Sequence, residues 1–250
     1  MLELFTSALA TDGLVWIAIG TLIAGLVRGF AGFGTGMIYL PVASQFLGPI
    51  EAMVTLVFVD CLGPLVAIPR AVRESDWPDL RTLLIGLLIG MPFGIWLLLS
   101  IPAETFRLSI SIVSLLLLAA LIFGVRYTGR LSRNKVFGVG GAAGVLGGAV
   151  GLPGPPVILF YMASTHPAHV IRATTMLFLF SFEIILLGML GFKGLLTLSG
   201  MIIGLTLVPA MLIGTLIGTW LFNPEYEKIY RIAAYIVIAV SAIRGLPIWG

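Results

Sequence analysis

The sequence predicts an all-α polytopic membrane protein. Of its 250 residues, 59% are hydrophobic and only 10% are charged, whereas a soluble domain carries about 25% charged residues. The stretches Thr82 to Ala103 and Gly194 to Pro224 contain no charged residue, and each exceeds the roughly 20 residues that a helix needs to cross the hydrocarbon core. Because barrel strands alternate in polarity over about ten residues, these long uniform stretches predict helices.

The apolar stretches divide the chain into about eight hydrophobic segments. These lie near residues 14–47, 50–69, 80–100, 105–125, 136–164, 170–192, 195–222 and 229–244. The first and the fifth are unusually long, and glycine or proline interrupts them at Gly29 to Gly36 and at Gly147 to Pro156. Each is therefore predicted to consist of two half-helices joined by an unwound turn.

The two halves of the chain resemble each other. An offset of 119 and then one of 124 align several small and aromatic residues. The aligned pairs are Gly25 with Gly144, Gly29 with Gly148, Gly32 with Gly151, Gly90 with Gly214, Gly94 with Gly218, Trp96 with Trp220, and Phe106-Arg107 with Tyr230-Arg231. We therefore expect two transmembrane repeats, residues 1–125 and 126–250, whose broken segments enclose a transport site.

Two topologies fit the broken segments. If each crosses the membrane once, the repeats are parallel, and if each is a re-entrant hairpin, the repeats are inverted. The first break leaves about 15 residues before it and about 12 after it, which is short for crossing and favours hairpins. Positive charges fit both topologies and mark two cytoplasmic connections: Arg70, Arg73 and Arg81, then Arg126, Arg130, Arg133 and Lys135.

The first break combines bare backbone with a positive charge. A half-helix that starts near Gly36 would direct unpaired N–H groups and its positive dipole end into the break, which favours an anion. We therefore expect substrate contacts from Arg28, Gly29, Gly32, Phe33, Gly34, Thr35 and Gly36. Two alternatives remain: the glycines serve close helix packing, and Arg28 extends to the membrane interface.

The second break carries three prolines, which donate no helix hydrogen bond. Non-helical backbone at membrane depth is tolerated where it is buried in protein or lines a cavity. The expected substrate contacts here are Gly148, Gly151, Leu152, Pro153 and Gly154. A wholly structural role is the alternative.

Two acids, Asp60 and Glu183, lie inside apolar segments. Such groups often mark proton paths, so both are candidates for proton coupling, with a structural ion pair to an arginine as the alternative. Arg172 is a candidate for attracting anions towards the pathway, or else a helix-end anchor. His166 and His169 lack the acidic or cysteine partners of a metal site, so no metal is expected.

The sequence also argues against other classes. It contains no Walker motif, nucleophile elbow or paired catalytic carboxylates, and its positive charges form no basic stripe for nucleic acid. We expect no enzyme activity and no cofactor. A channel could use the same glycine-lined break without alternating conformations, and a membrane-embedded enzyme is the weaker alternative.

The chain resembles the TauE/SafE sulfite exporter family, also called the toluene sulfonate uptake permease group. The resemblance rests on the run from Gly29 to Gly36 with the following Pro41, the counterpart from Gly148 to Pro156, and the two-repeat layout. It implies transport of sulfite, sulfonates or sulfur-containing organic acids. The chain departs from the usual pattern at Thr35, where glycine is frequent, and in its second motif, so the cargo stays open.

Together these features predict a secondary carrier of a small anion in the bacterial-type cytoplasmic (inner) membrane, as a multi-pass protein. Sulfite or an organosulfonate is the expected substrate, exposed to either side by alternating access at a site between the two broken helices, with proton coupling as an added hypothesis. The expected partners are this anion and the lipid bilayer. A homo-oligomer is compatible with the sequence, which does not decide the oligomeric state.

Overall fold

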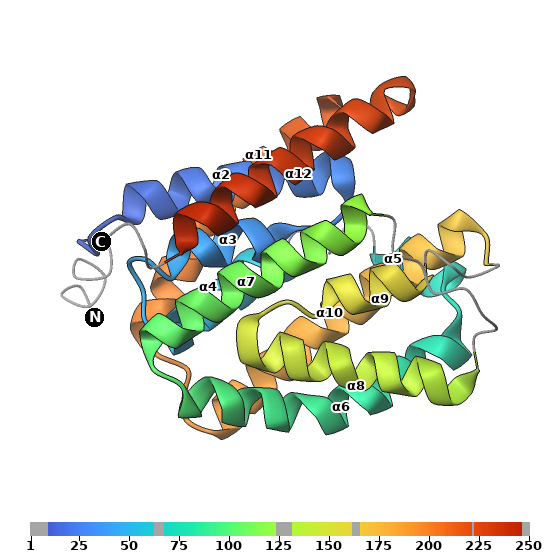
Figure 1. The fold of residues 1–250 in the computed structure, drawn as a ribbon, viewed down its shortest axis with the longest axis horizontal. Helices are drawn as coiled ribbons and strands as arrows, with labels where there is room; N and C mark the ends of the chain where they lie inside the picture. Colours follow the sequence, from blue (N-terminus) through green and yellow to red (C-terminus); the bar gives the residue numbers. More distant parts are fainter. Residues whose placement is uncertain (1–9, 63–67, 124–131, 162–165, 222, 247–250) are drawn as a thin grey trace. The chain divides into compact units, whose positions relative to one another are not determined.

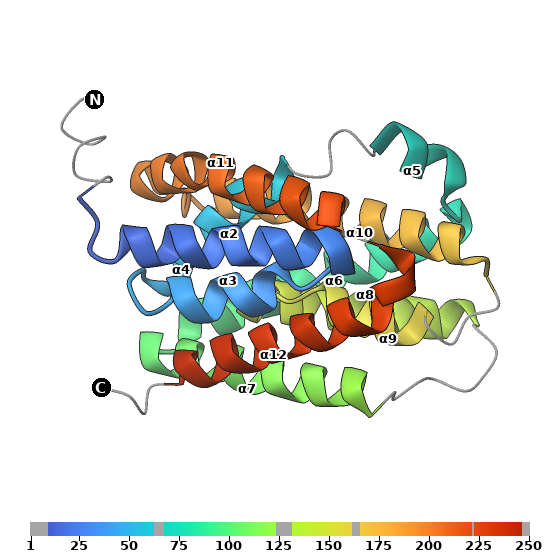
Figure 2. The ribbon, with the colours of Figure 1, turned by 90° about the horizontal axis from the view of Figure 1, so that it is seen from above.

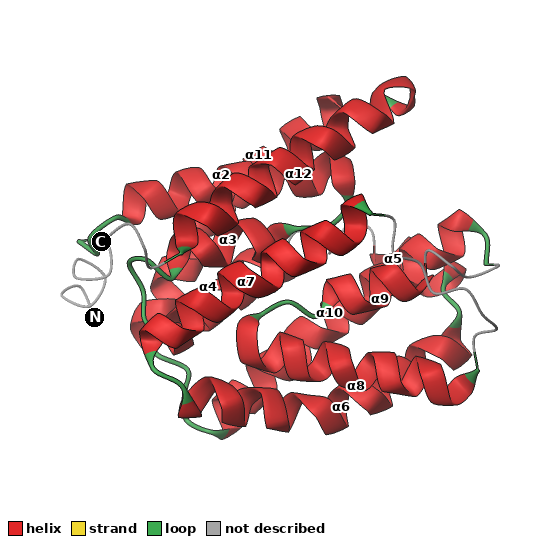
Figure 3. Cartoon of the chain, in the orientation of Figure 1, coloured by secondary structure: helices red, strands yellow, loops and turns green. Residues whose placement is uncertain are grey.

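The computed structural model describes residues 10–62, 68–123, 132–161, 166–221 and 223–246 (Figure 1). All regular secondary structure in these ranges is helical (Figure 3), which confirms the predicted fold class. The helices are α2 (Leu14–Ala31), α3 (Thr35–Ala43), α4 (Pro49–Cys61), α5 (Ile68–Glu74), α6 (Trp77–Ser100), α7 (Ala103–Ile122), α8 (Arg133–Val150), α9 (Gly154–Tyr161), α10 (Ala168–Phe192), α11 (Leu198–Leu221), the 3-10 turn η1 (Pro224–Tyr226) and α12 (Glu227–Gly245).

Four of the described helices are long and apolar enough to cross a membrane. They comprise α6, α7, α11 and the part of α10 from His169 to Phe192, while α2 contains a shorter apolar helix. Large apolar side chains point outward from these helices, among them Trp96 on α6 and Trp220 on α11. Lipid is the solvent that suits such a surface, so the chain is an integral multi-pass membrane protein.

The helices form two compact units. Unit 1 comprises residues 1–63, 102–118 and 190–250, and unit 2 comprises residues 64–101 and 119–189. Each unit therefore combines elements from both halves of the sequence, and the predicted repeats stay a prediction. The expected boundary at residue 125 lies outside the described residues.

In unit 1, α2 lies parallel to α11 at very short range. A Cβ atom at Gly214 would overlap the main-chain oxygen of Leu22, and one at Gly218 would overlap that of Leu26. Glycine is the one residue that permits this approach of two backbones.

Unit 2 contains a matching pair, because α6 lies parallel to α8. A Cβ atom at Gly90 would overlap the main-chain oxygen of Gly141, and one at Gly94 would overlap that of Val145. Gly90 and Gly94 are the residues that align with Gly214 and Gly218 in the sequence. In each unit a broken segment thus packs against a long helix from the other half of the chain.

Both broken segments fold back as hairpins. The start of α2 lies beside the end of α3, because Gly13 faces Phe46 while Gly20 faces Val42. Figure 2 shows α3 running back along α2, and Figure 1 shows α9 turning back from the end of α8. The structure therefore has the hairpins that the segment lengths favour, whereas inverted insertion of the repeats stays a prediction.

The described basic residues of the two predicted cytoplasmic connections share one end of unit 2. Arg81 lies near the start of α6 and Lys135 near the start of α8, and the parallel packing of these helices brings their starts to the same end. Arg126 and Arg130 lie outside the described residues. A shared end is what a common cytoplasmic side requires.

Replacing Gly90 by alanine tests the backbone contact between α6 and α8. We expect Gly90→Ala to lower the free energy of unfolding by about 1–3 kcal/mol, because the backbone of α8 cannot yield as a side chain would. The measurement is unfolding in detergent, followed by circular dichroism.

Gly138→Ala on α8 is the matched control, because a Cβ atom there meets no described atom within 4 Å. We expect this variant to match the wild type or to gain up to about 1 kcal/mol from helix propensity. Equal stability of the two variants would contradict the proposed constraint.

Candidate functional site

The break between α2 and α3 is three residues long. Gly32 (φ 78°) and Gly34 (φ 99°) both adopt the left-handed backbone conformation, which glycine enters at little cost. The N–H of Gly32 closes α2 by donating to the carbonyl of Arg28 at 2.8 Å. This turn reverses the chain and starts α3 at Thr35.

The first turn of α3 presents main-chain donors at this break. The amides of Thr35, Gly36 and Met37 have no carbonyl one turn before them in the helix, and no described side chain caps the helix start. A Cβ atom at Gly32 would meet no described atom within 4 Å. The break therefore combines the positive end of a helix dipole with open space beside its backbone.

Arg28 forms an ion pair with Asp60. The Nη1 atom of Arg28 donates to Oδ1 of Asp60 and approaches the Asp60 main-chain oxygen at 3.4 Å. Asp60 lies in the last turn of α4, whose dipole also favours a positive charge. Both side chains are 17% exposed. Arg28, the candidate anion contact, is thus directly paired with Asp60, a candidate for proton coupling. For Asp60, this is the ion pair with an arginine that the sequence offered as the alternative role.

The end of α2 is enclosed by α11 and α12 of the same unit. The rings of Phe30 and Tyr230 lie 5.5 Å apart, and the Tyr230 hydroxyl donates to the carbonyl of Leu221 at 2.5 Å. The Thr219 hydroxyl lies 3.4 Å from the Gly29 carbonyl. The sequence did not predict that Tyr230 or Thr219 belongs to the site. The one sequence feature that pointed to Tyr230 was its alignment with Phe106 in the other half of the chain.

Buried polar contacts and packing hold α3 beside this break. The Tyr39 hydroxyl donates to Oγ1 of Thr55 on α4 at 2.7 Å, and both side chains are buried. On the other side, Pro41 lies against Gly245 of α12. Thr35 is buried at the start of α3. The middle and the end of α3 are therefore held by α4 and α12.

The break between α8 and α9 has the same form but fewer donors. Gly151 (φ 67°) ends α8, and its N–H donates to the carbonyl of Gly147 at 2.9 Å. Pro155 and Pro156 occupy the first turn of α9 and supply no N–H group. Backbone donation at this break falls chiefly to Gly154, so the first break is the stronger candidate for an anion site.

Several predicted contact residues serve close packing. A Cβ atom at Gly29 would lie 2.5 Å from the main-chain oxygen of Thr215, and one at Gly148 would lie 2.7 Å from that of Met91. Leu152 and Pro153 are buried in unit 2. The packing alternative therefore accounts for Gly29 and Gly148, and the remaining glycines of the first break, Gly32 and Gly34, are set by backbone conformation.

The remaining candidate residues lie on α10 in unit 2. Glu183 is buried, and its neighbour Phe182 packs against Gly147 of α8. Arg172 is exposed, as a residue that attracts anions must be. Among the described residues, no group of three or more His, Cys, Asp or Glu side chains is placed to hold a metal ion.

Comparison with known families decides the family of the chain. The family model described as "Sulfite exporter TauE/SafE" matches residues 17–245. The chain belongs to the TauE/SafE family. No curated protein and no solved structure matches it.

The TauE/SafE match includes both breaks, the Arg28–Asp60 pair and all four long apolar helices. Membership indicates a membrane transporter for a sulfur-containing anion and agrees with the absence of an enzyme motif in the sequence. The family thus supplies the class of activity, and the geometry of this chain supplies the candidate groups.

A double-mutant cycle tests the Arg28–Asp60 pair. We expect Arg28→Gln and Asp60→Asn each to lower the melting temperature in detergent, because each leaves one charge without its partner in a mostly buried position. The double variant should be more stable than the two single effects predict by about 1–2 kcal/mol, since it leaves neither charge. Additive effects of the two substitutions would show that the pair contributes no coupling energy.

Proposed function

We propose that this chain is a secondary carrier of a small sulfur oxyanion, sulfite or an organosulfonate, in the cytoplasmic membrane. The observation that carries the proposal is the position of Arg28 at the end of α2, next to the break where α3 begins. The TauE/SafE membership supports the substrate class, and the apolar helices support the membrane location.

The donor set suits an oxyanion. A guanidinium offers several N–H groups in one plane, and the first turn of α3 adds main-chain donors and a positive dipole end. Sulfite presents three oxygens, which these donors can share. Phe33 is half-buried beside the glycines and offers an apolar contact for the organic part of a sulfonate.

The ion pair supplies a reason for proton coupling. Arg28 and Asp60 together are neutral, so an arriving anion must compete with the Asp60 carboxylate for the guanidinium. A proton on Asp60 would remove that competition and keep the site close to neutral in a medium where net charge is costly. We propose that the anion and a proton bind together at this pair, with Glu183 as a second candidate for coupling.

The remaining predicted contacts complete the proposal. At the first break, the anion contacts the backbone at Gly32, Gly34, Thr35 and Gly36. At the second break, the backbone from Gly151 to Gly154 offers further contacts. Arg172 raises the local anion concentration from its exposed position. Alternating access follows if the short helices α3 and α9 shift as the anion binds.

Arginine substitution tests the proposed site. We expect Arg28→Gln to weaken sulfite binding about 10–100-fold, which corresponds to the roughly 1.5–3 kcal/mol of a hydrogen bond to a charged group. Arg28→Lys should recover part of the loss. The measurement is saturable sulfite uptake into proteoliposomes, together with equilibrium binding in detergent.

Arg244→Gln is the matched control, because Arg244 is an exposed arginine of the same unit. Asp60→Asn should bind sulfite at least as tightly as the wild type and should lose the part of the pH dependence of binding that comes from Asp60. Unchanged sulfite affinity in a folded Arg28→Gln variant would remove Arg28 from the site. Counterflow in the wild type separates a carrier from a channel, since a channel shows none.

A further inference from the structure

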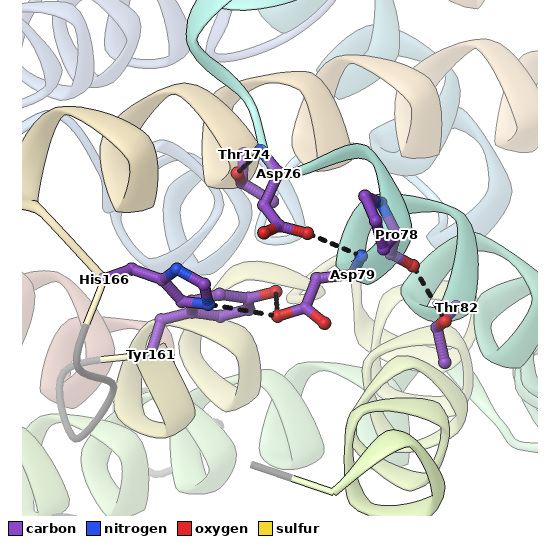
Figure 4. Close-up of polar contacts among 7 residues, drawn as sticks. All are labelled: Asp76, Pro78, Asp79, Thr82, Tyr161, His166 and Thr174. Atoms are coloured by element: carbon purple, nitrogen blue, oxygen red, sulfur yellow. Dashed lines mark hydrogen bonds and ion pairs between the residues drawn. The ribbon is translucent and has the colours of Figure 1, made fainter.

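A cluster of three ionisable side chains lies in unit 2 and contains none of the break residues considered above (Figure 4). The Tyr161 hydroxyl donates to Oδ2 of Asp79 at 2.9 Å, and Nε2 of His166 lies 3.6 Å from the same oxygen. The rings of Tyr161 and His166 lie 6.3 Å apart. One carboxylate oxygen is therefore shared by a phenol and an imidazole.

The three side chains come from three different elements. Asp79 lies in the first turn of α6, Tyr161 is the last residue of α9, and His166 precedes α10. Tyr161 is fully buried, whereas the side chains of His166 and Asp79 are 30% and 23% exposed. A proton from water can reach the imidazole, and its effect can pass to a buried group.

The local structure holds the carboxylate in place. The Asp76 side chain caps α6 by accepting from the N–H of Asp79 at 2.9 Å. The N–H of Asp76 in turn donates to the buried Thr174 hydroxyl of α10 at 3.0 Å. Asp79 is thus fixed by a helix cap that is itself tied to α10, so its side chain is positioned before any proton binds.

Several other charged or titratable groups occur on the surrounding elements. Asp76, which caps α6, adds a second negative charge, and Arg81 of α6 lies over the Trp77 ring at 6.0 Å. Arg70 pairs with Glu74 on α5. The others on these elements are Arg73 on α5, Arg133 and Lys135 on α8, and His169, Arg172 and Glu183 on α10. Asp79 is the acid that the structure places against His166.

We propose that Asp79, Tyr161 and His166 form a proton-binding site of the carrier, which links the protonation of His166 to the position of α9. The proposal rests on the carrier function proposed above. Imidazole is the side chain that ordinarily changes charge between about pH 5 and 8, and His166 supplies the imidazole of this cluster. The charged imidazole forms an ion pair with Asp79 and ties α6, α9 and the start of α10 together.

The neutral imidazole leaves Asp79 with only the Tyr161 hydrogen bond among these three residues. The state of His166 then changes how firmly the end of α9 is held. Gly154 and Tyr161 are the first and last residues of α9, so they lie about 10 Å apart along the helix at 1.5 Å per residue. The same short helix therefore joins the proton site to the second break, and proton binding favours the conformation described here.

The first test follows the proton without any transport. The chain contains two histidines, so His169→Gln leaves His166 as the only imidazole that nuclear magnetic resonance detects in labelled protein. We expect Asp79→Asn to move the midpoint of its ring signals to lower pH, because a neighbouring negative charge favours the imidazolium.

Glu104→Gln is the matched control for the charge change. Glu104 follows the far end of α6, which lies about 32 Å along that helix from Asp79, and its substitution should leave the midpoint in place. A midpoint that Asp79→Asn does not move would overturn the proposal, whether or not the chain transports sulfite.

The second test uses sulfite flux into proteoliposomes at a series of pH values. We expect His166→Gln to lose most of the flux change between about pH 5.5 and 7.5, while His169→Gln keeps it. Tyr161→Phe should leave His166 titrating but should reduce the response of flux to pH, since it removes only the hydroxyl that links Asp79 to α9.

The two tests separate the hypotheses. Wild-type protein without sulfite flux contradicts the proposed substrate, while the titration still reports on the proton site. Full retention of the pH response by a folded His166→Gln variant would overturn the coupling of this site to transport. Full retention by Tyr161→Phe would overturn the role of α9.

Discussion

The close approach of two helix backbones is the constraint on which each unit depends. In lipid, apolar side chains gain little from leaving their solvent, so helix association relies on packing at short range. Glycines supply that range between α2 and α11 and between α6 and α8, where added Cβ atoms would overlap main-chain oxygens. Each of these pairs joins the first helix of a hairpin to a long apolar helix. The break at the end of that first helix is therefore held by a scaffold that tolerates almost no side-chain growth.

Within that scaffold, the two breaks differ in chemistry although they share a backbone form. Both use left-handed glycines to end the first helix, Gly32 in one and Gly151 in the other. The first break retains its main-chain donors and has Arg28 one turn earlier, whereas prolines remove donors from the second. The same backbone form thus accompanies main-chain donors and a nearby arginine in the first break, and prolines without an N–H group in the second.

The sequence predicted the features that depend on local chemistry. Long uncharged stretches indicated helices, and glycine or proline clusters located both breaks because they restrict or free the backbone over a few residues. Segment length favoured hairpins, because the parts of the first broken segment before and after its break are short for crossing the membrane. The pairing of Arg28 with Asp60 spans 32 positions, and that of Asp79 with Tyr161 spans 82, so no local spacing reveals them. The sequence also did not reveal which helices belong to each unit, since this depends on which distant helices pack together.

The Arg28–Asp60 pair also explains how an ionised arginine can stand near a break in an apolar protein. A lone guanidinium there would carry a large desolvation cost, which a partner carboxylate and the C-terminal end of α4 reduce. The same pairing leaves both side chains 17% exposed. An anion that replaces the carboxylate conserves the charge balance of the guanidinium, whereas an anion that binds elsewhere in the apolar bundle would not. Under the function proposed above, exchange of one negative partner for another would keep the guanidinium paired while the anion binds.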